Sequence, residues 1–265
     1  MDTALDALLD ENLLAAMREL ARWQRGSVCV DADGLLTVAG TTPFPIGYAN
    51  CVVRTDRRLA PHHVLDRAAA FFAPRGRGFT VFVRGAFDAD LEAVLQRAGV
   101  ASLVDTPCMV IDRPLAPPAL ARGCELLVVT DEAAAVAVRE VNAEAYQSLG
   151  LPADETRALY GPPAKLLAPH YVTVLGCRGG RPVSTAMIIF SPLVAGVYWV
   201  GTTSDARRTG LAEACTRQVT NAAFEQGARA VTLQASPMGE PIYTRLGYRT
   251  FDRLRWYVVP APKSA

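Results

Sequence analysis

Residues 196–212 read Gly-Val-Tyr-Trp-Val-Gly-Thr-Thr-Ser-Asp-Ala-Arg-Arg-Thr-Gly-Leu-Ala. The first six residues are an apolar run that predicts a buried strand, and a basic turn that contains Gly210 follows it. This turn opens a helix, and the first backbone N–H groups of a helix have no acceptor within the helix, so they are free to bind a phosphate. The stretch therefore predicts a site for a cofactor that carries a nucleotide.

The residues after this turn predict a helix, a strand, a second helix and a last strand. Apolar residues recur at helical spacing from Leu211 to Ala223, and Gly227 ends this helix. Cys215 lies on its apolar side, which indicates a packing residue and not a nucleophile. The other three elements are expected at residues 230–235, 240–246 and 255–259.

Two motifs follow each other in this region, Arg207-x-x-Gly210-x-Ala212 at the strand-to-helix turn and Tyr243-Thr-Arg-Leu-Gly247-Tyr248 on the second helix. In this order they resemble the GNAT superfamily of acyl-CoA-dependent N-acyltransferases. The resemblance extends over residues 125–259, because the preceding segments also fall in the family's order. These segments predict a strand, a helix and two strands joined by a Gly-Gly turn, at residues 125–130, 131–149, 171–177 and 182–190.

A faint internal repeat indicates that the fold contains this unit twice. The strand-like run at 47–56 lies 149 residues before the run at 196–205, and both end in a turn that contains threonine and closes with aspartate. We therefore expect an α/β (α+β) protein with two GNAT-like domains, each a twisted mixed sheet flanked by helices. The alternative is two unrelated α/β segments whose glycines coincide.

The prolines near residue 114 resist both helix and central strand, and they predict a linker. The expected organisation is a degenerate GNAT-like domain at 1–112, a linker at 113–121, a catalytic domain at 122–259 and a tail at 260–265.

The first domain is expected to lack a cofactor loop. The repeat sets Arg58, Pro61 and His63 opposite Arg207, Gly210 and Ala212, and proline has no N–H to offer a phosphate. Leu95 stands where the second half has Tyr243. The first half is therefore predicted to keep the sheet without the chemistry.

Composition limits the cellular role. The chain of 265 residues is 51% hydrophobic, yet it has no apolar run of the length, about 18 residues, that spans a bilayer. Its first 22 residues read as an amphipathic helix and not as a secretion signal, so we expect a cytoplasmic protein. The net charge of +1 gives no reason to expect binding to nucleic acid or to a membrane. The sequence does not indicate an oligomeric state.

The six cysteines contain no Cys-x-x-Cys motif, so no metal site is expected. Disulfides would fit an exported protein. Without a secretion signal, we expect reduced and mostly buried thiols.

The turn and its neighbours supply the candidate cofactor site. The amides of residues 208–212 and the side chains of Arg207 and Arg208 are expected to bind the pyrophosphate. Resemblance to the family implies that acetyl-CoA is the acyl donor and that the end of the preceding strand pairs with its pantetheine arm, with a backbone N–H near Val200 polarising the thioester carbonyl. Ser236, where many relatives carry asparagine, either contacts the cofactor or caps a helix. The candidate cofactor-binding residues are Val200, Gly201, Thr202, Arg207, Arg208, Thr209, Gly210, Leu211, Ala212 and Ser236.

Tyr243 is the candidate catalytic residue, because it matches the family tyrosine that protonates the departing thiolate; its alternative role is aromatic packing. A phenol with an ordinary pKa of about 10 is protonated at neutral pH. Strand alternation predicts that either Tyr198 or Trp199 lines the cleft. No general base is assigned, although Glu144, His170 and Glu240 are near enough in the predicted fold to be considered.

The sequence thus predicts an N-acetyltransferase that transfers an acetyl group from acetyl-CoA to a primary amine of a small molecule, an amino acid or a peptide. Residues 131–171 are expected to bind this acceptor. One alternative is a non-catalytic module that binds acyl-CoA. A second alternative is an acyltransferase that uses an aminoacyl-tRNA donor, which would predict a basic groove.

Overall fold

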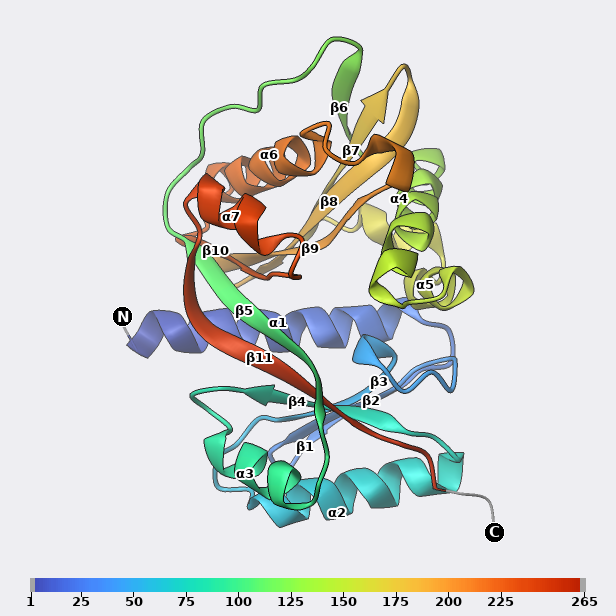
Figure 1. Cartoon of the computed structure of the whole chain (residues 1–265), viewed down its shortest axis with the longest axis vertical. Coiled ribbons are helices and arrows are strands. Elements are labelled where there is room, and N and C mark those ends of the chain that lie inside the picture. Colours follow the sequence, from blue (N-terminus) through green and yellow to red (C-terminus); the bar gives the residue numbers. More distant parts are fainter. Residues whose placement is uncertain (1–2, 263–265) are drawn as a thin grey trace. The chain divides into compact units, whose positions relative to one another are not determined.

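A computed structural model describes residues 3–262, so residues 263–265 of the predicted tail lie outside the described part. It contains seven α-helices and eleven β-strands (Figure 1). The helices are α1 (Thr3–Trp23), α2 (Pro61–Phe72), α3 (Ala89–Arg97), α4 (Glu132–Ala145), α5 (Ala153–Tyr160), α6 (Leu211–Glu225) and α7 (Glu240–Leu246). The strands are β1 (Val28–Ala32), β2 (Leu35–Ala39), β3 (Asn50–Arg54), β4 (Phe79–Arg84), β5 (Ser102–Ile111), β6 (Cys124–Val128), β7 (Tyr171–Arg178), β8 (Arg181–Ser191), β9 (Val194–Thr202), β10 (Ala230–Gln234) and β11 (Arg249–Val259).

The chain divides into two compact units. Unit 1 contains the chain up to Ala16 together with Met109–Phe251, and unit 2 contains Met17–Cys108 together with the chain from Asp252 onward. Each unit is therefore built from two separate segments, whereas the sequence analysis expects continuous domains. The predicted linker at 113–121 lies between β5 and β6 and contains no helix or strand.

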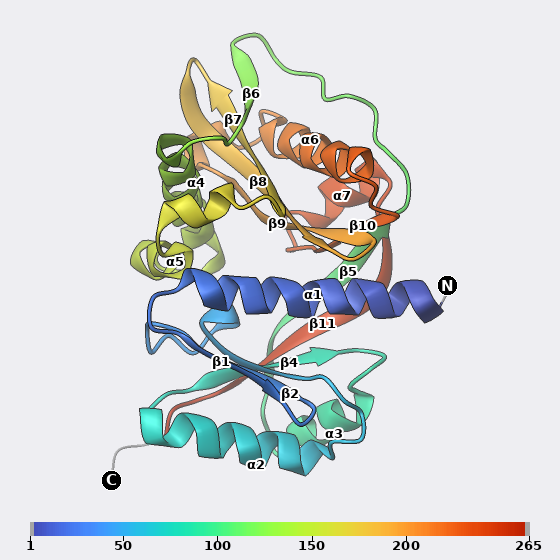
Figure 2. The same ribbon diagram turned by 180° about the vertical axis from the view of Figure 1, so that it is seen from behind.

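The sheet of unit 1 has the strand order β5-β10-β9-β8-β7-β6. Strands β6 to β9 pair antiparallel, and β9 pairs parallel with β10. Helices α6 and α7 bury Cys215, Val219 and Leu246 against one face (Figure 1). Figure 2 shows α1 in front of the strands on the other side, where Asn12 is fully buried and donates to the carbonyl oxygen of Ile189 at 3.1 Å.

Unit 2 repeats part of this topology. Its strand order is β1-β2-β3-β4-β11, with β3 parallel to β4 and β11 antiparallel to β4. The succession β3, α2, β4, α3 matches β9, α6, β10, α7, and a further strand follows in each case. The predicted repeat is confirmed in element order and strand direction. The two halves differ at two positions. Helix α2 begins at Pro61, where the second half has Gly210 before α6, and α3 carries the buried Leu95, where α7 carries Tyr243.

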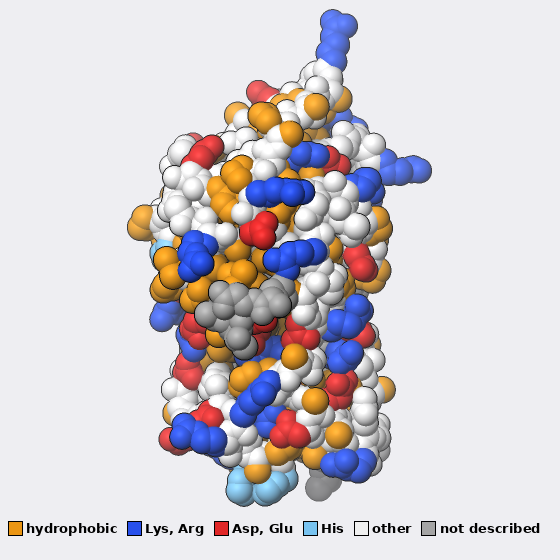
Figure 3. Space-filling model, turned by 90° about the vertical axis from the view of Figure 1, so that its left-hand side faces the viewer, with side chains coloured by type: hydrophobic (Ala, Val, Ile, Leu, Met, Phe, Trp, Pro, Cys, Tyr) orange, Lys and Arg blue, Asp and Glu red, His pale blue; other side chains and the backbone are white. Residues whose placement is uncertain are grey.

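The structure also tests the predictions for the N-terminal helix and the cysteines. The predicted N-terminal helix is α1, and all six cysteines are free thiols, four of them buried, as expected. Within residues 3–262 no helix is long and apolar enough to cross a membrane. Figure 3 shows basic and acidic side chains interspersed over one face of the molecule.

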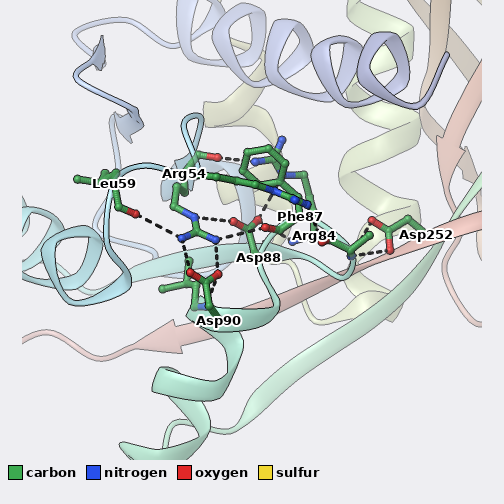
Figure 4. A network of polar contacts seen from close by, with 10 residues as sticks. Arg54, Leu59, Arg84, Phe87, Asp88, Asp90 and Asp252 are labelled. Carbon is green, nitrogen blue, oxygen red and sulfur yellow. Dashed lines mark hydrogen bonds and ion pairs between the residues drawn. The ribbon is translucent and has the colours of Figure 1, made fainter. Parts of the chain in front are cut away.

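A buried ion-pair network occupies the end of β3 in unit 2 (Figure 4). The Arg54 side chain is buried, and its Nε donates to the carboxylate of Asp88 at 2.9 Å, while a terminal nitrogen donates to Asp90 at 3.0 Å. Asp88 also pairs with the buried Arg84, whose guanidinium carbon lies 3.9 Å from the ring centroid of Phe87. Charged side chains thus fill the carboxyl ends of β3 and β4, at the place where unit 1 has the ends of β9 and β10.

We predict that Asp88→Ala destabilises the protein by about 3–5 kcal/mol, because it removes the buried carboxylate that Arg54 and Arg84 share and leaves Asp90 as the remaining carboxylate partner of Arg54. The measurement is urea-induced unfolding followed by circular dichroism and tryptophan fluorescence. Arg58→Ala is the control, since Arg58 pairs with Asp56 at 2.6 Å but its side chain is 91% exposed, and no measurable change is expected. Equal effects of the two substitutions would contradict the structural role of the network.

Candidate functional site

A cleft forms in unit 1 where two parallel strands diverge. Residues 194–196 of β9 pair with residues 230–232 of β10, and the ladder stops there although β9 continues to Thr202 and β10 to Gln234. The backbone of β9 beyond Gly196 is therefore not covered by β10. The opened edge is flanked by α6 and α7 on one side and by the end of α4 on the other.

The cleft has a volume of about 540 Å³, within the usual range of small-molecule sites. All eleven candidate site residues from the sequence line it, although they come from β9, from the loop before α6, from α6 itself and from the segment that includes α7. They are Val200, Gly201, Thr202, Arg207, Arg208, Thr209, Gly210, Leu211, Ala212, Ser236 and Tyr243. The structure therefore brings the predicted residues together, and their roles in binding and catalysis stay predictions.

The loop before α6 has the geometry of an anion site. Gly210 is left-handed, with φ 81°, and Arg208 is left-handed as well, with φ 63°. A hydrogen bond at the start of α6 joins the Ala214 N–H to the Gly210 carbonyl at 2.9 Å. The N–H groups of residues 211–213 precede it and have no acceptor within the helix, so they and the helix dipole favour a negative charge at this end of the cleft.

The charged side chains of the cleft gather at the same end. Arg207, Arg208 and Arg245 line it together with one acid, Glu213. The Glu213 carboxylate is engaged by Arg217 at 3.0 Å. Arg245 also lies 4.0 Å from this carboxylate, so Arg207 and Arg208 leave an excess of positive charge beside the free amides.

Tyr243 lies on α7 with its ring buried and its hydroxyl without a hydrogen-bond partner among the described residues. Its ring centroid is 6.0 Å from that of Tyr248. Burial raises the pKa of Tyr243 well above its usual value, so its hydroxyl stays protonated beyond the ordinary tyrosine pKa of about 10. The hydroxyl is therefore protonated at neutral pH.

Gly239 allows the Tyr243 ring to take this position. A Cβ atom at Gly239 would lie 2.7 Å from Cε2 of Tyr243, closer than van der Waals contact allows. Ser236 accepts a hydrogen bond from the Gly239 N–H at 3.2 Å and so caps the turn before α7, while it also lines the cleft. Both roles that the sequence left open for Ser236 are thus compatible with its position.

The prediction that Tyr198 or Trp199 lines the cleft is wrong. The Tyr198 hydroxyl donates to Asn12 at 3.0 Å, and the Trp199 ring packs against Tyr146 and Tyr160. An irregularity in the pairing of β8 with β9 explains the failure, because strict alternation of side chains does not pass through a bulge. The residues of β9 that line the cleft are Val200, Gly201 and Thr202.

The acids and the histidine considered as bases do not line the cleft. The Glu144 carboxylate accepts the Ser204 N–H at 3.1 Å, and the His170 ring packs against Tyr171 at 4.1 Å. Burial raises the pKa of the Cys215 thiol to about 12, which agrees with its predicted packing role. Within residues 3–262 no cluster of three or more His, Cys, Asp or Glu side chains is arranged to hold a metal ion.

Sequence reasoning missed several residues of the cleft wall. Gly239 and Arg245 flank Tyr243 on or next to α7, and Met238 and Ile242 line the same wall. The helical spacing of Gly239, four residues before Tyr243, is the signal that would have indicated the close approach. Nothing in the sequence marks Met238, which is 53% exposed.

Comparison with known proteins identifies the fold. No protein-family model matches the chain, and no curated protein sequence matches it. Among solved structures, a GCN5-related N-acetyltransferase from Kribbella flavida matches with a TM-score of 0.71 at 23% identity over 94% of both chains. A GCN5-related N-acetyltransferase from Sphaerobacter thermophilus matches with a TM-score of 0.67 at 16% identity, over 93% of this chain and 86% of the other. A tandem GNAT protein from the clavulanic acid biosynthesis pathway matches with a TM-score of 0.63 at 15% identity over 97% of both chains.

The chain therefore has the tandem GNAT fold, with two GNAT-like units of mixed α/β structure. This confirms the predicted fold class.

We predict that Gly239→Ala destabilises the protein by about 1–3 kcal/mol, because the new methyl group overlaps the Tyr243 ring. The measurement is a double-mutant cycle of unfolding free energies with Tyr243→Ala. The cost of Gly239→Ala is expected to vanish once the ring is removed. An equal cost in both backgrounds would mean that Gly239 serves the backbone of α7 and not the tyrosine.

Proposed function

We propose that this protein is an N-acetyltransferase that uses acetyl-CoA as acyl donor and that its active site is the cleft of unit 1. The observation that carries the proposal is the meeting, in one cleft, of a helix N-terminus with free amides and a buried tyrosine whose hydroxyl has no protein partner. The tandem GNAT fold supports the same reading, because the related structures are named N-acetyltransferases.

The residues of the cleft fit the acyl donor. The amides at the start of α6 and the three arginines suit the phosphates, since an anion gains both from the helix dipole and from charge-assisted hydrogen bonds. The uncovered edge of β9 suits the amides of the pantetheine arm, which would add to it as a further strand does. The left-handed Gly210, with no neighbour within 4 Å of a Cβ position, lets the backbone approach a phosphate closely.

The reaction would transfer the acetyl group directly. The neutral amine of the acceptor attacks the carbonyl carbon of the thioester, a C–N bond forms, and the C–S bond breaks. Tyr243, which its raised pKa keeps protonated, donates its proton to the departing thiolate, and water then returns a proton to the tyrosinate. The proton lost by the amine passes to water, because the cleft's one carboxylate, Glu213, is at the phosphate end and is paired with Arg217.

The acceptor would bind at the end of the cleft that α4 and the following turn form. This turn is the 3-10 helix η3 (Tyr146–Leu149). The residues that these two elements contribute to the cleft are all uncharged, namely Ala145, Tyr146, Ser148 and Leu149. We propose a primary amine on a small molecule, an amino acid or a peptide, with no second positive charge next to the reacting nitrogen, since no carboxylate is available there to pair with it.

A second candidate function is a non-catalytic module that binds acyl-CoA. The absence of a free carboxylate among the cleft residues favours it, because a binding module needs no general base. The unpartnered hydroxyl of Tyr243 favours the enzyme. The two candidates differ in turnover and not in affinity for the acyl donor.

We predict that acetyl-CoA stabilises the protein and that Gly210→Asp abolishes the effect, because a carboxylate would then face the phosphates. Saturation at about 100 times Kd adds roughly 2.7 kcal/mol to the free energy of unfolding. The measurement is thermal unfolding with and without acetyl-CoA. Gly227→Asp is a matched control at the other end of the same helix, with a similar φ of 87° and equally open surroundings. A missing response in the unsubstituted protein would refute the choice of acyl donor.

We predict that Tyr243→Phe lowers kcat by a factor of about 10² to 10⁴ and leaves the affinity for acetyl-CoA nearly unchanged. The measurement is the release of CoA thiol in the presence of a panel of primary amines that carry no second positive charge, amino acids and peptides included, with titration calorimetry for acetyl-CoA. Tyr248→Phe is the control, since Tyr248 is equally buried but its hydroxyl is bonded to Thr220 at 2.7 Å. Acetyl-CoA binding without turnover of any amine in the unsubstituted protein would favour the binding module.

A further inference from the structure

Strand β1 forms an edge of the sheet of unit 2 and pairs with β2 in an unbroken antiparallel register. All five of its residues are exposed, including Val28 at 40% and Val30 at 41%. Edge strands are usually protected against further pairing by proline, by unpaired charges or by a bulge. β1 contains no proline and no bulge, and its single charge, on Asp31, is paired with Arg18 at 2.7 Å. The edge is therefore open to another strand.

The turn after β1 fixes which of its backbone groups point outward. Its two residues both have a positive φ, 50° at Asp33 and 83° at Gly34, as a type I′ hairpin turn requires. The residues that flank such a turn form a hydrogen-bonded pair, so Ala32 directs its N–H and C=O groups toward β2. Hydrogen bonding alternates along an antiparallel ladder. The N–H and C=O groups of Cys29 and Asp31 therefore point away from β2, toward the open edge.

A second copy of β1 satisfies all of these outward groups. When the copy lies antiparallel with Val30 opposite itself, Cys29 of each strand lies opposite Asp31 of the partner subunit. Each of these two pairs exchanges two hydrogen bonds, so every outward N–H and C=O group of both strands finds a partner. The exposed Val30 side chains meet at the two-fold axis, which adds an apolar contact at the centre of the pairing.

The start of β1 borders a basic hollow. This hollow has a volume of about 260 Å³, and Gly26, Val28, Arg75 and Arg77 are among the residues that line it. Both arginines donate to backbone carbonyl oxygens. Neither is paired with a carboxylate within residues 3–262. The hollow therefore has unneutralised positive charge beside one end of the strand.

The other end of β1 carries an acid that suits this hollow. The Asp33 side chain in the turn is 85% exposed, and its ion-pair partner Arg67 is 3.6 Å away. In the register centred on Val30, Asp33 of the partner subunit lies opposite Ser27, next to Gly26 of the hollow. An antiparallel pairing of two identical strands thus brings each acidic turn to the basic hollow of the other copy. This charge complementarity favours a second copy of the chain over an unrelated strand.

We propose that β1 is a dimerisation surface and that its partner is β1 of a second copy of this chain, joined antiparallel about a two-fold axis at Val30. The sheets of two copies of unit 2 then become continuous. The proposal does not depend on the proposed function, since it involves no residue of the cleft. Pairing of one strand is a small contact, so a dimer that dissociates on dilution is expected.

The first test is oxidative cross-linking of two cysteine variants, made in a Cys29→Ser background that lacks the native exposed thiol. Val30→Cys is expected to form a disulfide-linked dimer, because directly opposed residues at a non-hydrogen-bonded position have Cα atoms about 4.5 Å apart. Val28→Cys is the matched control, with the same face and nearly the same exposure. Its two copies are four positions apart along the strands, about 13 Å, so its yield should be at least tenfold lower. The Cys29→Ser protein alone reports any cross-linking through other thiols.

The second test is sedimentation velocity over a range of concentrations, which detects the dimer without a cross-link. The mass of the unsubstituted protein should rise from one chain toward two. Cys29→Pro should weaken association at least tenfold, because it removes one outward N–H from each strand and none of the bonds to β2. Cys29→Ser is its control and should associate normally. Arg75→Glu should also weaken association, and it leaves β1 itself unchanged.

Three results would overturn the proposal. The unsubstituted protein remaining a monomer at every concentration would exclude the pairing. Equal cross-linking of Val28→Cys and Val30→Cys would exclude the register centred on Val30. A dimer that persists unchanged in both Cys29→Pro and Arg75→Glu would place the contact on another surface of the molecule.

Discussion

The candidate site depends on the separation of two parallel strands. β9 and β10 share a ladder only over residues 194–196 and 230–232, and after that each continues without the other. Backbone N–H and C=O groups normally find partners in a sheet, so an uncovered strand edge that faces a cleft offers them to a ligand. The loop before α6, the start of α6 and the buried Tyr243 all border this opening.

The two units show how the same topology is used in two ways. In unit 1 the carboxyl ends of the parallel strands border a cleft with a left-handed glycine, three arginines and free helical amides. In unit 2 the corresponding ends are filled by Arg54, Arg84 and their carboxylates (Figure 4), and the next helix begins at Pro61. These side chains occupy the space that is a cleft in unit 1. Removing one partner of such a buried ion pair would leave the other charge without solvation, so the pairs are held in place.

Much of the fold followed from local sequence patterns. The helix from Leu211 was predictable from its apolar spacing and the glycines at both ends, and the repeat of strand and helix was visible as an offset of 149 residues. The boundaries of the compact units were not predictable, since α1 up to Ala16 groups with the distant segment Met109–Phe251, and β11 from Asp252 onward groups with Met17–Cys108. The position of Trp199 also escaped prediction, because strand alternation assumes a regular ladder and β9 contains a bulge.

By itself the sequence determined the basic turn that contains Gly210, the helix that follows it and the presence of a tyrosine on the next helix, since each depends on neighbours within one or two turns of the chain. Only the tertiary structure decided which face of β9 meets the cleft, how closely Gly239 approaches Tyr243, and that Glu144 is bound to Ser204 and is not available as a base. These features depend on packing between segments that lie far apart in the chain, where the register of one strand and the size of one side chain set the distance, and a local pattern carries no record of either.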